Sequence, residues 1–437
     1  MKKGLAVVLG ALLLLGATLA FGAPVTLRYA LWDGGQKPAM EAAIQQFQKE
    51  NPNIKVSIEL TEWGDYWTKI QTGAAAGTVP DVFWGHVAYF ASLADTGALM
   101  DLSPYITKDK VDLSIYYPGL VDNWKYGGKQ YGLAKDWDTI CYAYNKDMTT
   151  KAGVDMNTLS WNPTDGGTFL KALQKLTLDK NGNNATQPGF DPNNVVQYGI
   201  AGMVAGEIQT GWLAFAWENG APGSVVLDKP FGTGFVMDDP ATLAALQFYA
   251  DLSKKYHVAP SASGSASMVG GPQDLFLAKK VAIYAAGPWT LASTRASATF
   301  PWDVAPLPTG PKGRVTPFNG LAHVVSAGTK APNEAWKLAS FMDGPRGENI
   351  IASFAVVFPS VKSALPTYLK AFSGKAPANI HYYTDEAAGK TGPYPQHLKW
   401  GQIWDIVNQR FDSAFSGDVT VQQAIAAAKA DVVPLLK

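Results

Sequence analysis

The feature that most constrains the fold is an alternation of strand-like and helix-like segments over the first hundred residues. β-Branched and aromatic residues predict the strands, and apolar residues three and four positions apart predict the helices. Asn51 and Pro52 end the first helix. The expected strands are 25–32, 53–60 and 80–84, and the expected helices are 38–50, 66–77 and 86–97. This alternation predicts an α/β fold with a largely parallel sheet.

Residues 1–22 have the pattern of a secretory signal peptide. A short basic start precedes an uncharged apolar stretch, and the small residues Ala20 and Gly22 suit a cleavage site. The stretch is nearly long enough to span a bilayer, so an uncleaved membrane anchor is the alternative. Cleavage leaves about 415 residues, which is too many for one ordinary core and predicts two domains.

The composition excludes some classes of protein and leaves others. The formal net charge is zero, and we find no basic stripe, so no nucleic-acid partner is expected. The single cysteine, Cys141, allows no internal disulfide and sits in an apolar run that favours a buried thiol. Only 16 % of residues are charged, while there are 14 Trp and 18 Tyr. These rings suit either a core or an aromatic binding surface.

Tryptophans with polar neighbours follow several of the predicted strands. In open α/β sheets, ligands bind beyond the carboxyl ends of the strands. Indole rings stack on the apolar C–H faces of sugars, and carboxylates accept hydrogen bonds from sugar hydroxyls. For any one tryptophan, a packed core residue is the alternative. The strand-end groups are Trp32 with Asp33, Trp84 with Gly85 and His86, Asp136 with Trp137 and Asp138, and Trp289.

The acid pair Asp136 and Asp138 raises the question of catalysis. The two residues share one face of an extended segment, and a glycosidase needs two carboxyl groups across the scissile bond. A loop cap or a ligand contact needs the same acids, and we favour ligand binding. The sequence contains no nucleophile elbow, zinc-protease helix, P-loop or complete dinucleotide-binding loop.

No metal or other cofactor is expected. The five histidines are scattered without metal-ligand spacing. Asp179, Asn181 and Asn183 imitate the start of a calcium loop, in a segment at 179–194. The glycine at the sixth position and the glutamate at the twelfth are missing, which argues against a calcium site.

Six segments together resemble the extracellular solute-binding proteins of bacterial ABC sugar importers, the family that includes the maltodextrin-binding protein. They cover most of the chain after the signal peptide and occur in the family's order. The segments are 74–84, 93–106, 127–148, 279–289, 317–342 and 414–432.

The resemblance implies a two-lobe periplasmic-binding-protein fold. Each lobe is then a doubly wound sheet flanked by helices, and hinge crossings near 136–140, 318–322 and 372–380 join the lobes. One lobe would comprise residues 24–136 with 322–372, and the other residues 138–318 with 380–437. The segment 179–194 has no counterpart in the family that we can align.

The resemblance also implies a set of ligand-binding residues. Trp84 matches a strand-end tryptophan at the sugar, Asp138 an acid of a crossing segment, and Trp289 and Trp404 stacking tryptophans. Asn319 and Gly320 match the second crossing. Trp63, Tyr394, Gln396 and Trp400 are assigned by position, and Trp32, Asp33, His86 and Asp136 complete the set. The stretch Gly85-His86-Val87 departs from the maltodextrin binder, which has an acid and a base there, so the identity of the sugar stays open.

The implied function is capture of a mono- or oligosaccharide between two closing lobes and its delivery to the membrane permease of an ABC importer. The expected protein is a monomer without enzymatic activity, located in the periplasm. Two alternatives stay open: a secreted glycoside hydrolase using Asp136 and Asp138, and a binder of a non-sugar solute such as a polyol or a glycerol phosphate.

Overall fold

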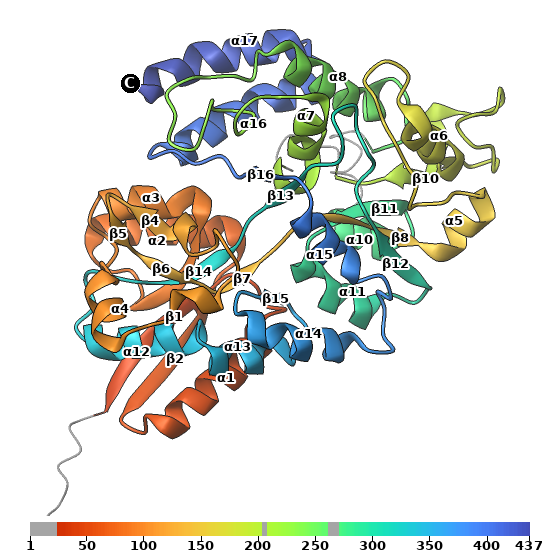
Figure 1. Cartoon of the computed structure of the whole chain (residues 1–437). Coiled ribbons are helices and arrows are strands. Elements are labelled where there is room, and N and C mark those ends of the chain that lie inside the picture. The colour runs from red at the N-terminus through yellow and green to blue at the C-terminus, as the bar shows by residue number, and fades with distance from the viewer. Residues whose placement is uncertain (1–23, 203–207, 261–270) are drawn as a thin grey trace, which may run out of the picture.

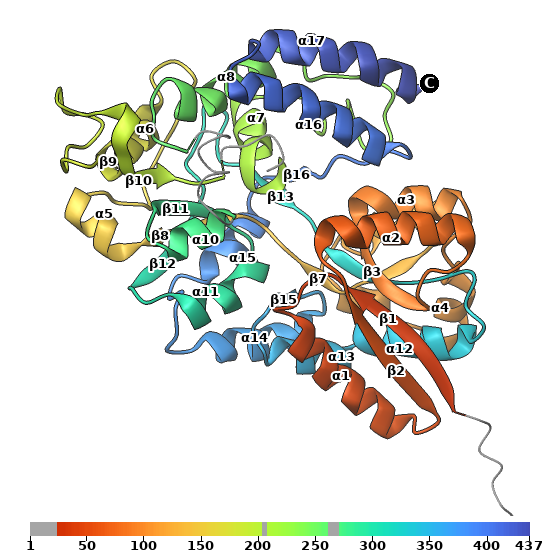
Figure 2. The same cartoon turned by 180° about the vertical axis from the view of Figure 1, so that it is seen from behind.

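The chain forms two lobes, one around each of two five-stranded sheets (Figures 1 and 2). The computed structural model describes residues 24–202, 208–260 and 271–437, so the predicted signal peptide lies outside the described residues. Within these ranges, no helix combines the length and the apolar character needed to cross a membrane.

The first lobe is built on a sheet of order β2-β1-β3-β14-β6. Strands β1 and β2 are parallel from Val25 opposite Ile54 to Leu31 opposite Leu60. Strand β14 enters from a distant part of the chain and pairs antiparallel with both β3 and β6. The strands are β1 Val25–Leu31, β2 Ile54–Leu60, β3 Val82–His86, β6 Gly132–Ala134 and β14 Leu321–Val325.

Helices from two separate parts of the chain flank this sheet. The faces that they bury are the apolar faces expected from the sequence; Met40, Ile44 and Phe47 of α1, for example, are at most 3 % exposed. The helices are α1 Lys37–Glu50, α2 Trp63–Ala76, α3 Val87–Asp95, α4 Ser103–Asp109, α12 Pro332–Met342, α13 Pro345–Ala352 and α14 Leu365–Phe372.

The second lobe is built on a sheet of order β12-β8-β11-β10-β9, in which only β10 and β11 are parallel. Helices α16 and α17 pack on each other and on α8, and lie above the first lobe in the view of Figure 1. The strands are β8 Cys141–Asn145, β9 Leu178–Asp179, β10 Val195–Ile200, β11 Val281–Ala286 and β12 Trp302–Ala305. The helices are α5 Lys146–Ala152, α6 Gly167–Leu176, α7 Leu213–Asn219, α8 Pro240–Lys254, α10 Pro272–Leu277, α11 Leu291–Ser297, α15 His381–Ala388, α16 Trp400–Ser416 and α17 Val421–Val432.

Short paired segments connect the lobes. Strand β7 (Asp136–Trp137) pairs with β15 (Phe358–Pro359), and β13 (Thr316–Phe318) pairs with β16 (Thr391–Pro393). The backbones of Asp138 and Asn319 exchange two hydrogen bonds, of 2.9 and 3.2 Å. A Cβ atom on Gly320 would lie 2.5 Å from the carbonyl oxygen of Asp136, so glycine is required where the two crossing segments touch.

The expected fold class is confirmed, but the expectation of a largely parallel sheet is wrong. Both sheets are mixed, because β14 and β8 each insert antiparallel to their neighbours. Strand-helix alternation predicts parallel pairing between consecutive strands, whereas β8 and β14 each begin directly after a short segment that crosses between the lobes.

Candidate ligand-binding site

A cleft of about 630 Å³ lies between the lobes, and residues of both sheets line it. Helix α3 of the first lobe contacts α16 of the second, so the lobes meet beside the cleft. Of the fourteen residues expected at the site, the following line the cleft: Trp32, Asp33, Trp63, His86, Asp136, Asp138, Trp289, Asn319, Tyr394, Trp400 and Trp404.

The first lobe presents a cluster of aromatic rings to the cleft. Trp32 follows β1, and its ring meets the ring of Trp63 edge-on at a centroid distance of 5.0 Å. Trp63 opens α2 and remains 43 % exposed, which is unusual for so large an apolar side chain. Tyr89 of α3 stacks on Trp67 behind it, at 4.1 Å. The cluster therefore holds one accessible indole ring on a packed aromatic base.

The second lobe presents Trp289 and Trp404. Trp289 follows β11, and its ring lies directly over the backbone of Gly287, where an added Cβ would come within 2.0 Å of the ring. Trp404 lies on α16 with its ring nearly parallel to that of Trp400, at 19° and 6.2 Å. Trp400 is 1 % exposed and supports Trp404 from behind. Both Trp289 and Trp404 are only partly buried.

Three expected residues do not line the cleft, and Trp84 is the clearest correction. Its side chain is fully buried, and its indole N–H donates a 2.7 Å hydrogen bond to the hydroxyl of Tyr29. The ammonium group of Lys135 lies 4.2 Å from the ring centroid. Strand β3 continues to His86, so Trp84 is a mid-strand core residue rather than a strand-end residue. Gly320 and Gln396 also lie off the cleft, and Gln396 accepts a backbone bond from Phe231.

Asp136 lines the cleft, but its carboxylate already contacts partners within the hinge. Its carboxylate pairs with the ammonium group of Lys135 at 2.5 Å and accepts a hydrogen bond from the backbone of Leu321 at 2.8 Å. Lys135 is fully buried and also donates to Gln36. Asp33 in turn accepts hydrogen bonds from the backbone of Gly35 and the side chain of Gln36. These acids stabilise the cleft floor, and their carboxylate oxygens already have hydrogen-bond partners, which leaves them little capacity to bind a ligand.

Asp138 belongs to a polar chain that runs from one lobe to the other. It contacts the side-chain amide of Gln209, which contacts the amide of Asn319, and Asn319 contacts Nε2 of His86 at 3.0 Å. Burial raises the pKa of Asp138 well above its usual range, and the charge of Asp136 adds to the effect. Burial lowers the pKa of His86 to about 3, so its imidazole is neutral.

Sequence reasoning missed Gln209, which lies in a π-helical turn, Ile208–Trp212, and follows no strand. It also missed Glu62 and Gln273. Gln273 is the second residue of α10, and its amide nitrogen lies within hydrogen-bond distance of the Thr290 carbonyl oxygen and the hydroxyls of Ser293 and Thr294, which holds the segment after Trp289 in place. Hydrogen-bonding roles of this kind depend on tertiary neighbours and leave no local sequence signal.

The charges at the cleft are exclusively acidic among the described residues. Asp33, Glu62, Asp136 and Asp138 line it, and no Lys or Arg does. No group of three His, Cys, Asp or Glu side chains within the described ranges is placed to hold a metal ion. Asp179, the first residue of the calcium-like pattern, accepts backbone hydrogen bonds from Asn181, Asn183 and Asp191. It therefore closes its own loop with both carboxylate oxygens.

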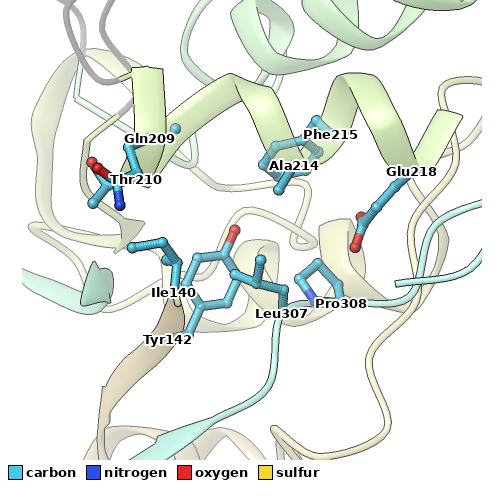
Figure 3. Close-up of a pocket in the computed structure, with 10 residues that line it drawn as sticks. Ile140, Tyr142, Gln209, Thr210, Ala214, Phe215, Glu218, Leu307 and Pro308 are labelled. Atoms are coloured by element: carbon cyan, nitrogen blue, oxygen red, sulfur yellow. The ribbon is translucent and has the colours of Figure 1, made fainter. Parts of the chain in front are cut away.

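A small cavity lies behind Gln209 and Thr210, on the second-lobe side (Figure 3). Its volume is about 10 Å³, which accommodates roughly one water molecule and no sugar. Glu218 lines it and accepts hydrogen bonds from the indole N–H of Trp161 and the backbone of Val315. Burial raises the pKa of Glu218 well above its usual range.

Two lobes with an aromatic cleft between them define the class, a two-lobed ligand-binding protein. The chain belongs to the bacterial extracellular solute-binding proteins, whose family model matches residues 42–379. It is an ABC solute-binding protein, and the family binds solutes without enzymatic activity. The glycoside hydrolase alternative is therefore wrong.

Three related proteins illustrate what the chain is similar to. The galactooligosaccharide-binding protein of Bacillus subtilis is 22 % identical over 90 % of this chain and 86 % of its own length. An ABC substrate-binding protein of Listeria monocytogenes in complex with cycloalternan is 27 % identical, with a TM-score of 0.82 over 94 % of this chain and 99 % of that one. UgpB from Mycobacterium tuberculosis in complex with glycerophosphocholine is 20 % identical, with a TM-score of 0.76 over 95 % and 98 % of the two chains.

Proposed function

We propose that the protein captures a carbohydrate between its lobes in the periplasm and delivers it, as a monomer, to the permease subunits of an ABC importer. The lobes of this proposal are residues 24–136 with 322–372 and residues 138–318 with 380–437. The observation that carries the proposal is the presence of accessible indole rings on both cleft walls and of a polar floor to whose lining the described residues contribute no Lys or Arg side chain. Such a cleft suits a ligand with apolar faces and many hydroxyl groups.

Residues of three kinds serve the ligand in this proposal. Trp63 from the first lobe and Trp289 and Trp404 from the second stack on sugar rings. Asp138, Asn319 and Gln209 meet hydroxyl groups at the hinge. Trp32 and Trp400 hold the stacking rings from behind, because each is packed against its neighbour. Relatives named for sugar ligands, such as the galactooligosaccharide binder, support the same assignment.

A phosphodiester such as glycerophosphocholine is the second candidate, because a structural neighbour binds it. Its choline group suits an aromatic cluster, since quaternary ammonium ions bind to ring faces. Its phosphate would face carboxylates without a compensating Lys or Arg among the described cleft residues, which argues against it.

Titration calorimetry separates the two candidates. The protein, freed of endogenous ligand by unfolding and refolding, is titrated with galacto-oligosaccharides, maltodextrins and glycerophosphocholine. We expect at least one oligosaccharide to bind with micromolar affinity or better and glycerophosphocholine not to bind. Binding of glycerophosphocholine alone would replace the carbohydrate proposal.

A further inference from the structure

Four side chains at the hinge form one hydrogen-bonded chain, and its direction can be worked out from donors and acceptors. The chain starts at His86, the last residue of β3 and the N-cap of α3. Nδ1 of His86 accepts the backbone N–H of Ala88 at 3.2 Å, so this nitrogen carries no proton. A neutral imidazole then carries its proton on Nε2, which must donate.

Asn319 and Gln209 follow from this assignment. The structure places Nδ2 of Asn319 3.0 Å from Nε2, so the Asn319 amide must be turned over to bring its oxygen toward His86. The structure places Nε2 of Gln209 toward Asp138 and its Oε1 toward Asn319, so this amide must also be turned over, with its nitrogen toward the Asn319 oxygen and its oxygen toward Asp138. Two oxygens would meet at Asp138 unless one of them carried a proton.

We propose that Asp138 stands in the cleft as an uncharged carboxylic acid that donates its proton to Gln209. The chain then runs from Asp138 to Gln209 to Asn319, and His86 donates to the same Asn319 oxygen. It contains four hydrogen bonds, counting the one from Ala88, and leaves the Asn319 amide nitrogen without a partner within this group.

The opposite direction is less favourable. With an ionised Asp138, Gln209 would donate to the carboxylate and Asn319 would donate to both Gln209 and His86. The proton of His86 would then sit on Nδ1, against the backbone N–H of Ala88, and α3 would lose its cap. This is the orientation in which the structure places the two amides, and it leaves Asn319 Oδ1 buried without a partner. The reversed chain therefore has one bond fewer and one contact between two donors.

The charged groups around Asp138 also favour the neutral acid. On its own segment, Asp136 repels a second negative charge, and Lys135, which attracts one, is already paired with Asp136. The other elements that face it contribute the neutral His86, the neutral phenol of Tyr394 and the amides of Asn319 and Gln209. No cation other than Lys135 reaches it from the described residues.

The hydrogen-bonded chain determines which ligand charge the cleft favours, and this step rests on the proposed function. Since Asp138 is neutral and Asp136 is neutralised by Lys135, the innermost part of the cleft carries no net charge. It therefore suits an uncharged carbohydrate better than an amino sugar or a sugar phosphate. Gln209 is the positioning residue that keeps Asp138 uncharged, because it links the hinge acid to the second lobe.

Nuclear magnetic resonance of the ligand-free protein tests the direction of the hydrogen-bonded chain. The Asp carboxyl carbons are labelled with ¹³C, Asp138 is assigned through Asp138→Asn, and the salt-bridged Asp136 provides a carboxylate reference. We expect the Asp138 signal at pH 6 in the protonated range, although an ordinary aspartate with a pKa of about 3.9 is almost fully ionised there. Histidine ¹⁵N spectra, with His86→Gln for assignment, should show the proton on Nε2.

Gln209→Met supplies a test in which the two directions predict opposite signs. In the proposed direction Gln209 accepts a bond from the neutral acid, so removing the amide lowers the Asp138 titration midpoint. In the reverse direction Gln209 donates to the carboxylate, and its removal raises the midpoint. A raised midpoint, a carboxylate signal at pH 6, or a proton on His86 Nδ1 would each overturn the proposal. These spectra need no ligand, so failure to bind sugar in calorimetry would count against the proposed function alone.

Discussion

Replacement of Trp289 by alanine should weaken carbohydrate binding without unfolding the protein. One face of the ring rests on the backbone of Gly287, so the opposite face is the one open to the cleft. A tryptophan side chain has roughly 200 Å² of surface, so one face covers about 80 Å². At about 25 cal/mol per Å², burial of that face by a sugar contributes about 2 kcal/mol. This corresponds to a loss of affinity of about 30-fold.

Calorimetry on the alanine variant and on a matched Trp289→Phe variant measures this contribution. Phenylalanine keeps an aromatic ring over Gly287, so we expect its loss to be several times smaller than that of alanine. The midpoint of thermal unfolding of the free protein should change little in either variant, because Trp289 is only partly buried. Normal affinity together with a much lower unfolding midpoint would show that Trp289 is a core residue and would refute the reasoning.

Four further predictions concern the floor and the hinge. Trp84→Phe should lower the free energy of unfolding by about 1–3 kcal/mol through a lost hydrogen bond and a cavity, with affinity unchanged within about two-fold; a large loss of affinity in calorimetry would restore Trp84 to the site. Lys135→Met should cost about 3–5 kcal/mol in urea unfolding by leaving Asp136 buried and unpaired, and adding Asp136→Asn should recover part of it. No recovery would show that the pair is not coupled. The raised pKa of Asp138 means that the folded state holds its proton above the unfolded value of about 3.9, so wild-type stability relative to Asp138→Asn should fall as pH rises from about 4. A relative stability that rises over this range would contradict the neutral acid. Small-angle scattering should show a smaller radius of gyration with saturating sugar, because a ligand held by rings of both lobes favours the closed form; identical curves would indicate a rigid pocket.

The sequence predicts the parts of the site that depend on local position. Trp32 and Trp289 follow buried strands, and the structure places both on the cleft. The sequence misplaces Trp84, because the apolar run of β3 predicts a strand that ends at this residue. The strand continues for two more residues, and β14 pairs with it opposite Trp84.

What the sequence does not predict depends on contacts between distant segments. Strand β14 reaches the first sheet after residues of the second lobe, and nothing in its apolar pattern indicates antiparallel pairing with β3. Gln209 lies on an irregular helical turn, and it becomes a hinge residue only because Asp138 and Asn319 cross beside it. Its importance follows from tertiary hydrogen bonds rather than from its neighbours in sequence.

The most direct test of carbohydrate capture is native mass spectrometry of the protein purified from its host under gentle conditions. We expect a complex whose added mass equals a whole number of sugar units, and the complex should be absent from a Trp289→Ala, Trp404→Ala double variant that is still folded. A retained phosphodiester, or a sugar complex that persists in the double variant, would contradict capture of a carbohydrate between the tryptophans of the cleft.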